Sequence, residues 1–114
     1  MTLTIETIIR INAQEATGDD NLILLETIAE SLNADPEGLY HRIEANKVFH
    51  AMLDGESTFT NAIDYEVAQQ FRLYNVNPEA VEPKWAASIA GIATNIWNKG
   101  MLARRNKAEE NITL

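Results

Sequence analysis

Three side chains that could bind a metal recur along one stretch of the chain. Glu37, His41 and Glu44 are spaced at i, i+4 and i+7, so a helix would place all three on one face. A carboxylate, an imidazole and a second carboxylate are a suitable ligand set for a divalent cation. No further ligand lies nearby in sequence, so a solvated helix face is the favoured interpretation. We expect no metal and no cofactor.

Other residues with catalytic potential are few. The serines are Ser31, Ser57 and Ser88, and none lies in a nucleophile-elbow pattern or a glycine-rich phosphate loop. Gly18-Asp19-Asp20 is similar to the metal-binding triplets of polymerases, but it lies between two predicted helices. There, Asp19 or Asp20 is better explained as the cap of the second helix. The sequence therefore predicts a protein that is not an enzyme and has no catalytic residues.

The elements that would position these residues are helices. Apolar residues at helical spacing predict helices over about 4–17, 21–32 and 84–98, the last continuing toward 105. A further helix is predicted from Asn61 or Asp64 to about Tyr74. Asp35-Pro36-Glu37 predicts a further helix start, with an acid as cap and proline in the first turn. Residues 78–82 are expected to form a short turn or a helical fragment. These patterns predict a mainly α, compact multi-helix domain over residues 1–107, followed by a flexible tail over 108–114.

Residues 47–60 have two interpretations. The segment Lys47–Leu53 extends the preceding helix, with Asp54-Gly55 ending it, or it pairs with Glu56–Thr60 as a short β-hairpin around Asp54-Gly55. A hairpin here would resemble the wing of a winged helix.

The segment over about residues 21–46 resembles a helix-turn-helix unit. Ile28 and Leu32 would face Leu39 and Ile43 across the two helices, and Asn33 lies where such sequences usually carry glycine. The resemblance implies a second helix that contacts DNA or another macromolecule. The residues that it would present are Glu37, Tyr40, His41, Arg42 and Glu44.

The charge distribution argues against DNA as the partner. The chain has a net charge of −8, and its first 46 residues hold nine acids against Arg10 and Arg42. DNA phosphates are bound by cations and backbone donors, so an acidic recognition helix would be repelled. A basic cluster lies at the other end of the chain, at Lys99, Arg104, Arg105 and Lys107. A basic nucleic-acid patch is one interpretation of this cluster, and a solvated helix end is the other.

The helix predicted around residues 84–98 offers a candidate self-association seam. Ala87 and Gly91 are four residues apart, which would let a second helix approach closely. The candidate residues are Trp85, Ala87, Gly91, Ile96 and Trp97. Packing within the chain is the competing explanation of the same pattern.

Composition limits the remaining classes. Cysteine is absent, which excludes disulfides and thiolate metal sites, and the N-terminal residues lack the pattern of a signal peptide. The most apolar segment, residues 85–97, is shorter than the roughly 20 residues that a membrane span needs. We therefore expect a cytoplasmic protein without membrane contacts, located in the host cytoplasm or the virion if it is phage-encoded.

By elimination, the sequence predicts a non-enzymatic protein-interaction module that binds a protein partner or itself. Small acidic helical chains of this kind are similar to phage or mobile-element accessory proteins that act in assembly or host interference. One alternative is a helix-turn-helix regulator or a small-terminase-like DNA-packaging protein. A second alternative is a nucleic-acid mimic that inhibits a DNA-binding enzyme, suggested by the acidic first 46 residues.

Overall fold

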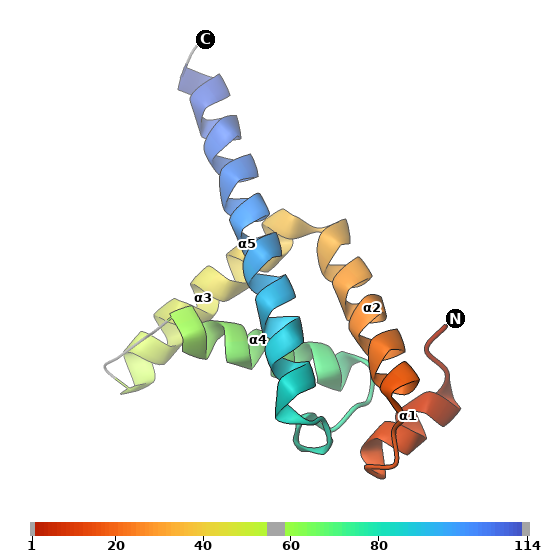
Figure 1. Ribbon diagram of the computed structural model, residues 1–114. Coiled ribbons are helices and arrows are strands. Elements are labelled where there is room, and N and C mark those ends of the chain that lie inside the picture. Colours follow the sequence, from red (N-terminus) through yellow and green to blue (C-terminus); the bar gives the residue numbers. More distant parts are fainter. Residues whose placement is uncertain (1, 55–58, 113–114) are drawn as a thin grey trace.

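The computed structural model describes residues 2–54 and 59–112, with side chains over 2–49 and 59–108. Within those residues the chain is helical and contains no strand, which confirms the mainly α fold (Figure 1). The elements are α1 (Ile5–Asn12), α2 (Gly18–Ala34), α3 (Pro36–Asp54), α4 (Phe59–Leu73), the 3-10 helix η1 (Pro78–Ala80) and α5 (Pro83–Ile112).

The first helix is shorter than predicted, and a different residue caps the second. α1 ends at Asn12, and Gln14 adopts a left-handed φ of 61° in the turn that follows. Thr17, rather than Asp19 or Asp20, caps α2. Its hydroxyl accepts from the Asp20 N–H while the Asp20 carboxylate accepts from the Thr17 N–H, a reciprocal capping box. Gly18 therefore begins α2 instead of ending α1.

The turn expected at Asn33 does not form. α2 continues through Ala34, and Asp35 alone separates it from α3. The predicted cap at Asp35 is confirmed, since its carboxylate accepts from the Gly38 N–H at 3.0 Å and Pro36 is the first helical residue. The connection between α2 and α3 is thus shorter than the three- or four-residue turn of a helix-turn-helix.

Residues 47–54 follow the helical alternative, because α3 runs through Asp54. The hairpin is therefore wrong for these residues, and Phe59 and Thr60 belong to α4. Val48 and Phe49 are exposed, so side-chain burial is not the reason for this outcome. Extending an existing helix adds one backbone hydrogen bond per residue without a new nucleation step, which outweighs the local β propensity of the segment. The remainder of the proposed hairpin, residues 55–58, lies outside the described residues.

The long helix α5 packs across the other elements. It contacts α2, α3 and α4, and Figure 1 shows it crossing α3 and α4 with α2 beside it. It extends through Ile112, past the start of the expected tail at 108, while the flexibility of that tail stays a prediction. No helix in the described part of the chain is long and apolar enough to cross a membrane.

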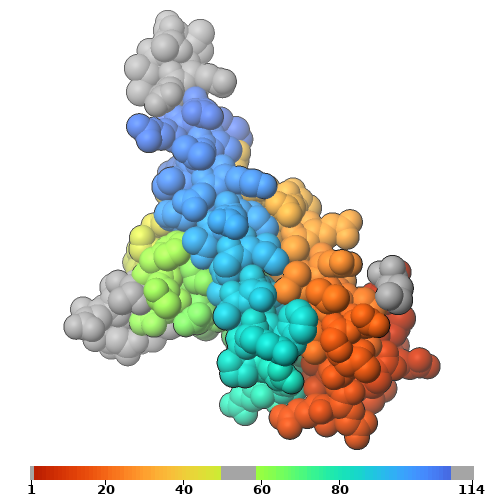
Figure 2. All heavy atoms as spheres, in the orientation of Figure 1, coloured from red at the N-terminus to blue at the C-terminus, as the bar shows by residue number. Residues whose placement is uncertain are grey.

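The core gathers apolar residues from every α-helix and from both sides of η1. Its members are Ile11, Leu24, Ile28, Leu32, Leu39, Ile43, Ala62, Ile63, Val67, Phe71, Val76, Val81, Ile89, Ala93 and Ile96. Where α3 begins, it presses so closely on α5 that a Cβ at Gly100 would overlap the Pro36 carbonyl oxygen. The C-terminal part of α5 extends beyond this crossing and stands out from the body of the molecule (Figure 2).

Candidate binding surface

The face of α3 that the helix-turn-helix resemblance assigns to DNA is covered by α5. Glu37 forms an ion pair with Lys107 at 2.7 Å, and His41 Nδ1 accepts from Arg104 Nη1 at 3.3 Å. The Tyr40 ring lies 5.8 Å from the Trp97 ring, centre to centre. Three of the five candidate residues therefore face a neighbouring helix.

The other two candidates on α3 point elsewhere. Arg42 Nε donates to Glu66 on α4 at 2.7 Å, and Glu44 lies 3.4 Å from Lys47 on its own helix. The structure therefore does not bring the five predicted side chains together as one surface. Among the described residues, no group of three or more His, Asp or Glu side chains could hold a metal ion.

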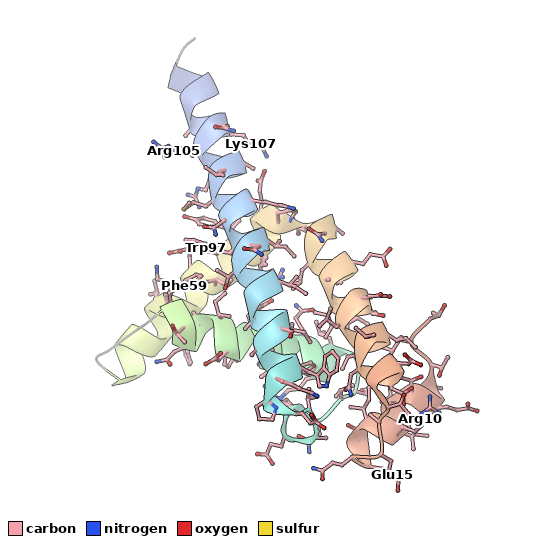
Figure 3. All side chains as sticks on the ribbon, viewed as in Figure 1. Arg10, Glu15, Phe59, Trp97, Arg105 and Lys107 are labelled. Carbon is pink, nitrogen blue, oxygen red and sulfur yellow. The ribbon has the colours of Figure 1, made fainter. Side chains whose placement is uncertain are left out.

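The basic cluster is divided in a similar way. The Arg104 guanidinium carbon lies 5.7 Å from the centre of the Tyr40 ring, and Arg104 also contacts His41. Lys107 forms an ion pair with Glu37, so both basic residues contact α3. Arg105 lies on the opposite side of α5 from Lys107 (Figure 3). Lys99 is exposed. Half of the predicted patch thus contributes to intramolecular packing.

The candidate self-association residues lie at different depths. Ile96 is in the core, and Trp97 packs between Tyr40 and Phe59, with the Phe59 ring 4.7 Å away (Figure 3). Trp85 is half-buried against the core. Ala87 and Gly91 are exposed, and a Cβ at Gly91 would meet no atom within 4 Å. The structure thus leaves only the two small residues fully at the surface.

A buried polar cluster on α4 was not predicted from the sequence. Glu66 is 3% exposed, and its Oε1 accepts from both Arg42 Nε at 2.7 Å and Gln70 Nε2 at 3.0 Å. Gln70 is 4% exposed, and its own Oε1 is buried without a hydrogen-bond partner. Buried polar atoms nearly always have a partner, so this oxygen requires an explanation.

The cluster opens onto a surface hollow of about 530 Å³ between α2, α3 and α4. A second hollow, of about 440 Å³, lies between α1, α2 and the end of α4. Leu73 lines both. We call the two together the Leu73 groove; its lining residues are Thr2, Leu3, Thr4, Ile5, Ile8, Thr27, Glu30, Ser31, Asp35, Arg42, Ala45, Asn46, Tyr65, Glu66, Gln69, Gln70, Leu73, Tyr74 and Asn75.

The groove combines exposed apolar side chains with an acidic lining. Leu73 is 71% exposed and Ile5 is 76% exposed, the highest values among the large apolar residues that protrude from the described surface. The charged residues that line the groove are Glu30, Asp35, Glu66 and Arg42, and the last two are paired with each other. The groove therefore has apolar anchoring points in a negatively charged setting.

A signal for this site was present in the sequence. Glu66 and Gln70 are four residues apart, so they lie on the same side of a helix. That side adjoins the apolar stripe of Val67 and Phe71, so a helix that buries the stripe also buries the two polar side chains. Charged and amide side chains at such positions are seldom buried without a specific partner. The partner Arg42 lies 24 residues earlier in the sequence, which no local pattern identifies.

A second buried ion pair joins α1 and α2. Arg10 donates through Nε and Nη2 to the two oxygens of Asp20, at 2.8 and 2.7 Å. The hydrogen bonds from Arg10, followed by the Thr17 backbone N–H, hold the pKa of the Asp20 carboxyl well below its usual value. The same pairing raises the pKa of Arg10. This pair fastens the start of α2 to α1.

No protein family, curated protein or solved structure matches this chain. The function is therefore inferred from the chain's own surfaces.

Proposed function

We propose that this chain is a non-enzymatic protein-interaction module whose Leu73 groove binds a basic, amphipathic helical segment of a partner protein. The observation that carries the proposal is the exposure of Leu73, which lines both hollows. Surface leucines are common singly. Here the leucine lies between two hollows, with Ile5 and Tyr65 also on the lining.

The apolar residues supply the binding free energy. Leu73, Ile5 and Tyr65 are 71%, 76% and 39% exposed, so a covering segment would remove a large apolar area from water. The groove lies alongside α2, and an amphipathic helix presents apolar residues every three or four positions to such a surface.

The negative charge of the groove lining favours a positively charged segment as its ligand. Outside the Arg42–Glu66 pair, the charged lining residues are Glu30 and Asp35, and both are exposed. The whole chain carries a net charge of −8. A segment rich in lysine and arginine is complementary to this surface and would associate faster at low salt.

The test is a titration of the whole chain into a fluorescein-labelled helical peptide of leucines and lysines, followed by anisotropy. Leu73→Gln should weaken binding by roughly tenfold, since a leucine that becomes largely buried when the peptide binds contributes about 1.5 kcal/mol to the binding free energy. Leu102→Gln on α5 is the matched control, because Leu102 is 50% exposed and lies outside the groove. Equal affinities of the two variants would overturn the proposal, as would an absence of peptide binding.

DNA binding is the alternative, and it rests on the helix-turn-helix resemblance of residues 21–46. The contacts of Glu37, Tyr40 and His41 with α5 oppose it. Duplex DNA titrated at low salt distinguishes the two, because phosphate contacts are strongest there. Tight, salt-sensitive DNA binding that is lost in Arg42→Ala would replace the interaction module with a DNA-binding function.

A further inference from the structure

The buried oxygen of Gln70 marks a position for a hydrogen-bond donor that none of the described residues supplies. We propose that the hollow beside Glu66 and Gln70 receives the guanidinium of an arginine from the bound segment. The inference rests on the proposed function and deepens it, since it names the residue type that the groove selects.

The orientation of the Gln70 amide is determined by its neighbour. Gln70 Nε2 donates to Glu66 Oε1 at 3.0 Å, and turning the amide over would place two oxygens against each other. The amide oxygen must therefore stay where it is buried and unpartnered. A donor from outside would satisfy it and remove the penalty of an unpaired buried acceptor.

Glu66 has capacity to accept from the same ligand. The hydrogen bonds found for Glu66 among the described residues both end on Oε1, from Arg42 and Gln70. A carboxylate has two oxygens and accepts about four hydrogen bonds. A forked donor can therefore bond both Gln70 Oε1 and the Glu66 carboxylate.

A guanidinium fits this hollow better than other donors do. It is a planar fork that only donates, and it stacks on aromatic faces such as that of Tyr65, which lines the same hollow. The charged residues that line this hollow are Asp35, Glu66 and Arg42. Glu66 and Arg42 form an ion pair, so the lining has one net negative charge for the ligand. The volume of about 530 Å³ exceeds that of an arginine side chain.

The experiment titrates N-acetylarginine amide into the ¹⁵N-labelled chain and follows the Gln70 side-chain amide by NMR. We expect a saturable shift, and N-acetylcitrulline amide should bind at least about fivefold more weakly because its urea lacks the charge and has a carbonyl oxygen in place of one donor NH2 group. Asp35→Asn should also weaken arginine binding. It leaves the α3 cap in place, since asparagine caps helices as well as aspartate does.

Several results would overturn the inference. They are an absence of saturable change at Gln70, equal binding of the citrulline probe, or unchanged arginine binding in a folded Gln70→Met variant. The last two would indicate a neutral-donor site or a resident water only. If these results occurred while the leucine–lysine peptide still bound in a Leu73-dependent way, the arginine pocket would be wrong and the proposed function would stand.

Discussion

Two arginine–carboxylate pairs in this molecule are alike in burial and in shortest distance, yet differ in how completely they are hydrogen-bonded. In both pairs the arginine is about half exposed, the acid is about 5% exposed and the shortest N–O distance is 2.7 Å. Asp20 uses both oxygens, toward Arg10 and the Thr17 N–H. Within the described residues, Glu66 accepts through Oε1 alone, and the neighbouring Gln70 amide oxygen has no partner.

We propose that this difference separates a structural contact from a binding site. A fully bonded buried pair rigidifies the fold, and a partly bonded one keeps acceptors for something else. The Asp20 pair connects α1 to α2 at a helix start, whereas the Glu66 cluster lines an open hollow. Burial and distance alone would have classified the two as equivalent.

The largest expected effect comes from removing each acid. Asp20→Ala deletes the capping box together with the contact to Arg10, so it should lower the melting temperature by several degrees. Glu66→Gln should lower it clearly less, because the new amide oxygen can still accept from Gln70 Nε2 and Arg42 can turn to water. Thermal unfolding followed by circular dichroism at pH 7 measures both. The reverse order would contradict the distinction between the two pairs.

Replacing each arginine with lysine tests the geometry of the pairs. Lysine cannot bond two carboxylate oxygens as a fork, so Arg10→Lys should destabilise the chain. Among the described residues, Arg42 meets Glu66 through Nε and not as a fork, and Arg42→Lys should change the free energy of unfolding by only about 0.5 kcal/mol. Urea denaturation provides the comparison, and equal losses would show that the two pairs work in the same way.

Ionisation of Asp20 should contribute to the way the stability of the fold changes with pH. Because its pKa is lowered in the folded chain, the ionised carboxylate stabilises the fold above the unfolded value of about 3.8. That stability is lost as the pH falls from there through the folded pKa. Asp20→Asn should therefore flatten the decline in stability between neutral and strongly acidic pH. Parallel stability profiles for the two proteins would contradict this role.

Replacing Gln70 should have an effect of the opposite sign. Gln70→Met removes the buried acceptor and keeps a similar volume, so we expect a gain of about 0.5–1 kcal/mol in the free energy of unfolding. Sites that bind ligands often carry such a cost in stability. A clear loss in urea denaturation would mean that Gln70 is needed by the fold itself.

Local signals in the sequence predicted local features of the fold. Asp35-Pro36 marked the start of α3, and Pro78 marked the short 3-10 helix, because capping and proline geometry act within a few residues. The Asn33 turn was wrong, since asparagine tolerates left-handed φ without requiring it. That conformation occurs instead at Gln14 and Asn75.

The surfaces were harder to predict because they depend on distant partners. Nothing near Tyr40 in the sequence shows that Trp97 and Arg104 will cover it. In the same way, the Leu73 groove joins segments from α1, α2, α3 and α4. Such contacts follow from the path of the whole chain, whereas helical periodicity describes one segment at a time.

The most direct test is one NMR titration that observes both arginine pairs at once. With the leucine–lysine peptide carrying one central arginine, we expect the side-chain signals of Arg42 and Gln70 to shift in a saturable manner. The Arg10 Nε–H signal, already bonded to Asp20, should stay in place. Saturable binding that moves Arg10 and leaves Arg42 and Gln70 unchanged would contradict the assignment of the Glu66 cluster as the binding site.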